Sequence, residues 1–456
     1  MLSTPARWCM LAATALSAGG CATYSPLPLG EGRGADSVAQ LRVPAANMPL
    51  PTFTMHRFDL SDGLDVTEIA MLGVANNPAL KVKRDEFGVA RAQAFAAGLL
   101  PDPQVSVGVD FPHPSSPDLT SAYTLGLSED IGAWLTRSTR VAAMRAQANQ
   151  INLDLLWAEW QTIAQSRLLF DQTFSLRATE RRLETERAAL APVSRYVEMA
   201  LRAGNLTYDA ANAGLNALSD VQRRLGDNAI ALDQAQSDLH GLLGLAPQAP
   251  LDLVGEAYQA IPTTAQVDQA LADLPRRRPD LLALQAGYAA QDEKFRGAIL
   301  AQFPALTLGF TRARDTGNVN TRGFTIGFSL PLFDRNRGNI AIETATRQRL
   351  KDDYETRLLT TRSDMQRLLA DLAILDQQQT LSSAHAAQLD AALHAAEHVW
   401  QTGLIDWPTY LAIRSNALSA DLDVIAARQE RSKQAIALQA LLGNTDFPNS
   451  AQAPMP

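Results

Sequence analysis

Two hydrophobic periodicities alternate along the chain, and each predicts a different kind of element. Short runs alternate apolar residues with small polar ones, the pattern of a strand with one apolar face. Long runs rich in Ala, Leu, Gln, Glu and Arg are typical of helices. No glycine or proline occurs from Asn339 to Thr402, and from Ala133 to Ala203 there is only Pro192. We therefore expect helical rods of some 60 residues, roughly 90 Å long, that pack lengthwise against other helices.

Four strand-like runs are expected, at 103–111, 121–129, 304–312 and 322–331. Their alternation is that of transmembrane β-strands with lipid outside and a wet lumen inside. Because the smallest barrels close with about eight strands, four per chain predict an oligomer. The plainer alternative is two hairpins with one face on a helical core. The positions that we assign to the lipid-facing surface are Val105, Val107, Leu125, Leu127, Leu308, Phe310, Ile326 and Phe328.

The chain repeats itself at an offset of about 200 residues, which indicates a duplicated unit. The segment 123–128, Tyr-Thr-Leu-Gly-Leu-Ser, aligns with 324–329, Phe-Thr-Ile-Gly-Phe-Ser. In each unit a helical segment (62–100 or 265–302) precedes two strands, a rod, a glycine turn and a returning helix (206–243 or 408–442). The divisions that we expect are a first repeat at 60–245, a Pro-rich connector at 246–264, a second repeat at 265–443 and a tail at 444–456.

The first 20 residues have the pattern of an export signal, with Arg7 before a short apolar stretch and small residues before Cys21. We expect Cys21 to be lipid-modified, with 21–59 as an extended tether. The alternative is cleavage nearby by an ordinary signal peptidase. The small residues before Cys21 resemble a bacterial lipoprotein cleavage box, and by that resemblance Ala22, rather than Asp, after the cysteine favours sorting to the outer membrane.

Composition narrows the class of protein further. Among 456 residues, 40 bases against 48 acids give a net charge of −8, which argues against a nucleic-acid partner. The only cysteines are Cys9 and Cys21, so a disulfide cannot hold the mature fold together. Beyond the N-terminal segment, no apolar stretch is long enough for a membrane helix.

Particular phrases give the chain a resemblance to a known family. They are Asn-Asn-Pro-Ala-Leu at 76–80, Gly-Leu-Leu-Pro-Asp-Pro-Gln at 98–104, Arg-Arg-Pro-Asp-Leu at 277–281 and Phe-Ser-Leu-Pro-Leu-Phe-Asp-Arg-Asn-Arg-Gly-Asn at 328–339. With the twofold repeat, these resemble the TolC-type outer-membrane efflux proteins, in their lipoprotein branch. The resemblance implies a mainly α fold with a membrane β-barrel portion, in which a homotrimer shares one barrel and one periplasmic helical tube. It also implies passive conduction of drugs, metal ions or other solutes, with a periplasmic adaptor and an inner-membrane pump as partners. A periplasmic coiled-coil adaptor, or a structural lipoprotein without a pore, is the alternative.

The same resemblance places adaptor contacts at the turns after the two rods. These turns contain Gly204, Asn205, Leu206, Gly403, Leu404 and Ile405. Just beyond them, Asp209 and Asp406 are candidates to line the tube entrance, and the alternative is that they cap the returning helices. His394 and His398 lie four apart on a helix with Glu397 between them, but there is no third His nearby and no HExxH order. We expect no catalytic residue, no metal site and no cofactor other than the lipid on Cys21.

Overall fold

The computed structural model describes residues 24–43, 48, 53, 56–113, 118–255, 262–303 and 306–442. The export signal, Cys21 and the tail beyond 442 therefore lie outside the described residues. The chain divides into two units, Met1–Gly34 and Ala35–Pro456. Residues 24–34 of the first unit lack helix and strand. Within the described residues, no helix is both long and apolar enough to cross a membrane.

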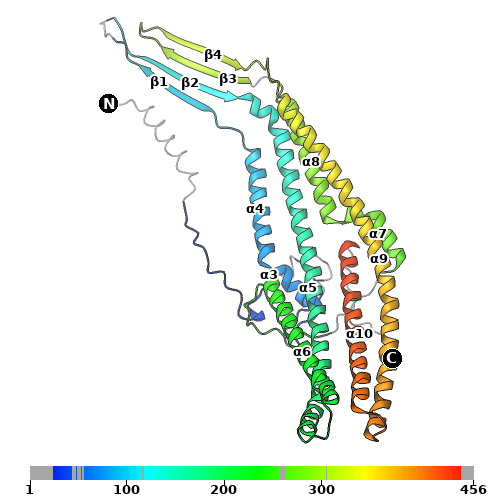
Figure 1. Cartoon of the computed structure of the whole chain (residues 1–456). Helices are drawn as coiled ribbons and strands as arrows, with labels where there is room; N and C mark the ends of the chain where they lie inside the picture. The colour runs from blue at the N-terminus through cyan, green and yellow to red at the C-terminus, as the bar shows by residue number, and fades with distance from the viewer. Residues whose placement is uncertain are drawn as a thin grey trace. The chain divides into compact units, whose positions relative to one another are not determined.

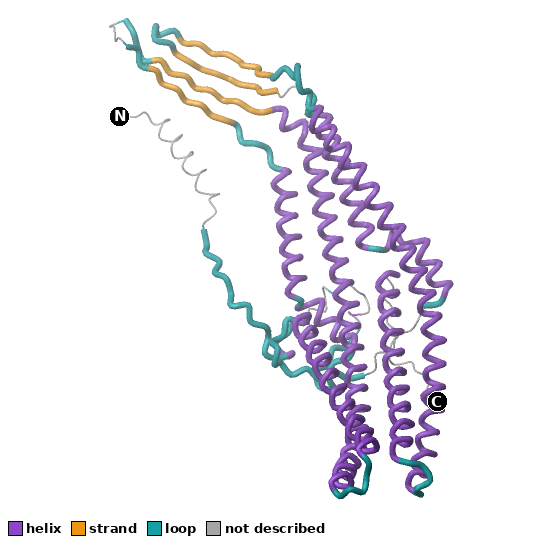
Figure 2. Tube along the Cα trace, viewed as in Figure 1, coloured by secondary structure: helices purple, strands orange, loops and turns teal. Residues whose placement is uncertain are grey.

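The second unit contains the twofold repeat expected from the sequence (Figure 1). Its elements, in chain order, are the short 3-10 helix η1 Val38–Gln40, α3 Val66–Asn76, α4 Pro78–Gly98, β1 Gln104–Asp110, β2 Ala122–Asp130, α5 Ile131–Arg202, α6 Tyr208–Leu243, α7 Thr264–Arg277, α8 Pro279–Leu300, β3 Leu306–Arg314, β4 Asn320–Phe328, α9 Arg337–Gln401 and α10 Trp407–Leu442. The rods are 72 and 65 residues long, and Pro192 does not end the first. Figure 2 shows the strands beyond one end of the helices and the rod turns at the opposite end.

The helical segments expected at 62–100 and 265–302 are each two helices, so the expectation of single helices is wrong. The breaks fall at Asn77 and Arg278, the residues before Pro78 and Pro279. A residue before proline is disfavoured in helical conformation, and proline suits the first helical position. Asn77 ends α3, and its side chain then accepts a hydrogen bond from Leu80 N at the start of α4.

Arg278 occupies the equivalent break in the second repeat, where it is 1% exposed. Its guanidinium donates two hydrogen bonds to Asp280, at 2.9 and 2.7 Å, and lies 4.8 Å from the ring centre of Trp157 on α5. Arg357 of α9 also donates to Asp280, at 2.9 Å. The Arg-Arg-Pro-Asp phrase therefore joins α8 to both rods.

The extended tether expected at 21–59 is shorter than predicted, because the packed part of the chain already begins at Ala35. From Ala35 onward the chain packs against the second unit's core, since Ala35 N donates to Gly244 O and Ala246 N to Ala35 O. Val38 and Leu41 contact the buried cluster there. The Pro and Gly content of the segment suggested a tether, but several of its apolar residues are partly buried against this cluster, to which Leu245 and Ala249 of the connector region also belong.

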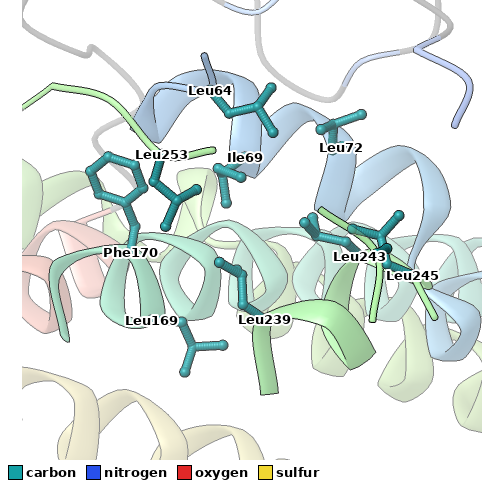
Figure 3. Close-up of a cluster of buried hydrophobic side chains, with 10 residues drawn as sticks. Leu64, Ile69, Leu72, Leu169, Phe170, Leu239, Leu243, Leu245 and Leu253 are labelled. Carbon is teal, nitrogen blue, oxygen red and sulfur yellow. The ribbon is translucent and has the colours of Figure 1, made fainter. Parts of the chain in front are cut away.

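Two equivalent cores hold the repeats together. Leu169, Leu239 and Leu243 belong to the first, with Ile69 and Phe170 (Figure 3). Leu368, Leu438 and Leu442, each 199 positions later, belong to the second, as do Val267, Leu274 and Met365. The sequence repeat is thus a repeat of packing.

Candidate functional site

The four strands form one antiparallel sheet in the order β1-β2-β3-β4. Their bounds differ from the expected ones by one to three residues. β1 and β4 are the sheet's two edges, and within the described chain neither has a partner on its outer side. The candidate site, this four-stranded sheet, is therefore not closed into a barrel by the described strands of one chain.

The register places the expected lipid-facing residues on a single face. Val105 is opposite Leu127, Leu127 is opposite Phe310, and Phe310 is opposite Phe324. Leu308 is opposite Ile326 in the next row. These side chains are exposed in the single chain, with Ile326 at 63%. The plainer alternative fails here, because no helical core covers this face among the residues that the structure describes.

The other face of the sheet carries mainly small residues, with Gln104, Asp110 and Asp130 at strand ends. Ser106, Gly126, Thr311 and Gly323 form one cross-strand row, in which hydroxyls alternate with glycines. A Cβ added to Gly327 would lie 2.6 Å from Thr307 Oγ1, so the hydroxyl fills the space that glycine leaves. The side chains on this face are therefore mostly small and polar, as expected for the wall of a water-filled lumen.

The two rod turns have the same backbone geometry. Gly204 and Gly403 adopt left-handed φ values of 76° and 74°. Asn205 N donates to Ala200 O, and Leu404 N donates to Val399 O, at 2.9 and 3.1 Å. Both are helix ends closed by a left-handed glycine. The exposed Leu404 projects from the second turn, 77% accessible.

Asp406 caps a helix, as one of the two interpretations predicts. Its Oδ1 accepts a hydrogen bond from Thr409 N at 3.1 Å, and bonding to Thr409 lowers the pKa of its carboxyl. Asp209 does not occupy the equivalent place. It is the second residue of α6, so the cap position falls to Thr207, and the capping interpretation is wrong for Asp209. The side chain of Asp209 lies outside the described residues.

An aromatic cluster at the second tip was not anticipated from the sequence. The rings of Trp400 and Tyr410 stack with centroids 4.8 Å apart, and Trp407 lies 5.4 Å from Trp400. A Cβ added to Gly214 would lie 2.9 Å from Trp407 Nε1, so this indole covers α6 of the other hairpin. The sequence did contain a signal for this cluster, because Trp400, Trp407 and Tyr410 lie on both sides of the turn at Gly403.

An ionic network also joins the two hairpins, near the same end. Glu186 of α5 is buried and bonds Arg414 of α10, with Nε–Oε1 at 2.5 Å. Arg182 bonds Glu186 at 3.2 Å and Asp421 of α10 at 2.7 Å. Arg414 also donates to the hydroxyl of Tyr410 at 3.0 Å. Sequence reasoning missed this network because the residues that bond across the two hairpins lie more than 200 positions apart in the chain.

The histidine pair is not assembled into a metal site. His394 and His398 are exposed on α9, and His394 lies 3.6 Å from Asp390. In the part of the chain that the structure describes, no group of three or more His, Cys, Asp or Glu side chains is arranged to hold a metal.

Known proteins agree with this architecture. Residues 268–444 match the family model of outer membrane efflux proteins. The pyoverdine export outer membrane protein OpmQ of Pseudomonas putida is 25% identical over 386 residues, 78% of this chain and 80% of that protein. The CmeC outer membrane channel of Campylobacter jejuni has a similar structure, with a TM-score of 0.71 at 15% identity, covering 95% of this chain and 94% of CmeC. The outer membrane protein VceC of Vibrio cholerae gives 0.68 at 16% identity, covering 83% of this chain and 96% of VceC.

The chain is similar to outer membrane efflux proteins, and it has the fold of their channels, which combines a helical tube with a strand barrel. It is a component of an outer-membrane efflux channel, and the coiled-coil adaptor alternative is set aside.

Proposed function

We propose that three copies close into one conduit that carries solutes passively outward from an inner-membrane pump and its adaptor. Twelve strands would form a barrel in the outer membrane, and the helices a tube on its periplasmic side. The observation that carries the proposal is a sheet with an apolar band across one face and, within the described chain, two unpaired edges. Lipid tolerates the apolar face but not the edges, so the sheet must close.

The helices also support ring closure. Like the strands, they lie in a row that has two different ends. Near the strands, α4 packs on α5, α5 on α8 and α8 on α9. Near the turns, α6 packs on α5, α5 on α10 and α10 on α9. One side of the chain therefore presents β1, α4 and α6, and the other presents β4 and α9 (Figure 1). Two different sides that join head to tail generate a ring when the rotation from one copy to the next closes.

Both sides carry exposed apolar side chains that a neighbouring copy would cover. On α4, Val89 and Phe95 are 58% and 71% exposed. On α9, Leu359 and Leu381 are 70% and 62% exposed. Exposed apolar residues along a whole side are typical of an interface between subunits.

Disulfide trapping across the seam tests the proposal. Val107→Cys on β1 is combined in turn with Cys at Phe324, Ile326 or Phe328 on β4, all on the apolar face. One of these pairs should give a covalent trimer that resists heating in detergent. The matched controls pair Val107→Cys with Cys at Thr325 or Gly327, which lie on the opposite face of β4, and should not crosslink. Monomers throughout, or equal crosslinking on both faces, would overturn ring closure.

For the tube entrance, we propose that Asp209 and Asp406 face the solute path, with Asp406 capping α10 at the same time. A ring of carboxylates favours cations and repels itself. Asp209→Ala with Asp406→Ala should then raise conductance or lower cation preference in planar bilayers. Unchanged conduction together with a stability loss of about 1 kcal/mol from the Asp406 substitution would leave only the cap. We place adaptor contact at the turns 204–206 and 403–405, which the exposed Leu404 supports.

For the anchor, we propose an acyl lipid on Cys21. Cys21→Ala should abolish labelling by radioactive palmitate, while the trimer remains in the outer-membrane fraction because a closed barrel buries far more apolar surface than one acylated terminus. Unchanged labelling would contradict the assignment.

A further inference from the structure

Three arginines project from the apolar face of the sheet at the end away from the helices. Arg312, Arg314 and Arg322 continue the outward register of β3 and β4, where Arg312 is directly opposite Arg322. They begin one outward position beyond the pair Phe310 and Phe324, about 7 Å further along the strands. The positions 201 earlier hold Phe111, His113 and Ser121, so the cluster belongs to the second hairpin alone.

The apolar band ends lower on β3 and β4 than on β1 and β2. Arg312 shares its row with Leu125, and Arg314 shares the next row with Tyr123. Barrel strands tilt by about 35–45°, so a row perpendicular to the strands is inclined to the membrane plane. The diagonal boundary places the arginines at the outer rim of the band.

Nothing in the sheet neutralises this charge. Among the outward-facing strand residues that the structure describes, the single carboxylate is Glu129, at the helix end of β2, where it accepts a hydrogen bond from Trp134 Nε1 at 3.0 Å. Arg314 is held by Ser121 O at 2.9 Å and lies 5.2 Å from the ring centre of Tyr123. Arg312 and Arg322 have no ion pair with any described carboxylate.

Like charges directly opposite on neighbouring strands destabilise a sheet, so the Arg312–Arg322 pair calls for an anion between the two guanidinium groups. Ring closure would not provide one, because the outward residues of β1 are Val105, Val107 and Val109. The anion must therefore come from the surroundings of the barrel rim. Guanidinium groups match phosphate oxygens with paired hydrogen bonds, and their aliphatic stems can lie along apolar surface.

We propose that Arg312 and Arg322, supported by Arg314, bind phosphate groups of the glycolipid in the outer leaflet, once per chain around the barrel. The inference rests on the proposed function, since the turn end of the strands must face outward. The occupant is the lipid headgroup rather than free phosphate, because the arginines border a face that only lipid tails can cover. Bound lipid would fix the height of the barrel in the membrane.

The test compares lipid retention by purified trimers. Wild-type protein, incubated with equal amounts of bisphosphorylated and dephosphorylated lipid A, should retain the phosphorylated form in excess by mass spectrometry. Arg312→Gln with Arg322→Gln should retain both forms equally, whereas Arg312→Lys with Arg322→Lys should keep part of the preference. The control Arg195→Gln with Arg202→Gln removes the same charge from the turn end of α5 and should behave as wild type. Inorganic phosphate should not displace the lipid.

Three results would overturn the inference: no preference in wild type, an unchanged preference in the double Gln variant, or equal loss in the α5 control. Failure of the proposed function is distinguishable, because wild-type protein would then form no heat-modifiable trimer. If the double Gln variant itself fails to assemble, the Lys pair and the wild-type comparison of the two lipids decide the matter.

Discussion

Asp171 shows what burial does to a single side chain in this fold. It lies on α5, 8% exposed, four residues after the buried Arg167, which donates to Gln439 of α10 at 2.9 Å. Burial raises the pKa of its carboxyl from 3.8 to about 6, and the Ser432 hydroxyl opposes that rise. The protonated form is therefore favoured by folding.

We expect mild acid to stabilise the helical portion through this residue. A carboxyl whose pKa is raised in the folded state contributes fully below its unfolded value, and the contribution is lost as pH rises through about 6. The 2-unit rise corresponds to at most about 3 kcal/mol per chain. Thermal melts of the helical signal, followed between about pH 4 and pH 7, should show this loss in wild type and not in Asp171→Asn. The exposed Asp227→Asn should retain it, and an identical pH profile for all three proteins would contradict the assignment.

At the scale of elements, the strands were the part best predicted from sequence, and the helix breaks were the worst. Period-two alternation depends only on the two faces of a strand being different, so the face on which each residue lies could be anticipated from the sequence, whereas the pairing between strands could not. The breaks at Asn77 and Arg278 depend on one proline each, within segments that otherwise have helical composition. The burial of Arg278 and the Glu186–Arg414 pair depends on which helices lie side by side, and local pattern contains no such information.

The two faces of the strands should respond differently to charge. Arg in place of Val107 or Ile326 would point into lipid and should disfavour membrane insertion by about 2–4 kcal/mol near mid-bilayer. Thr311→Arg points to the opposite face and should mainly alter conductance. Thr311 is a better site for this comparison than Gly126, since a side chain at Gly126 would meet Ser106 Oγ. Trimer yield from folding into vesicles measures the first effect, and equal losses on both faces would contradict the lipid-facing assignment.

At the scale of the whole molecule, the hairpins α5–α6 and α9–α10 are held to one another near their turns by few polar contacts. The carboxylate of Glu186 bonds both Arg414 and Arg182, and Arg182 reaches Asp421. These contacts add to the apolar cluster that Leu183 of α5 shares with Leu411 and Leu418 of α10. Their removal should loosen the spacing of the hairpins around the proposed tube and let the turn end widen.

Glu186→Gln with Asp421→Asn should therefore raise single-channel conductance while leaving the strands in place. The matched control is Asp220→Asn, which removes a carboxylate bonded only to Arg223 and Arg224 of its own helix. Conductance in planar bilayers should rise in the first variant and stay at the wild-type value in the second. Equal conductance in all three proteins would show that the network does not restrict the tube.

The two unlike sides of the chain have a genetic consequence. In the proposed ring, each copy would offer its β1 side to one neighbour and its β4 side to the other, so a chain that is damaged on one side would still join a ring through its intact side. It then leaves that ring open. In a cell with equal amounts of normal and one-sided chains, only about one ring in eight would be built from three normal copies. Alleles of this kind should be dominant over the normal gene, whereas alleles that destroy both sides should be recessive.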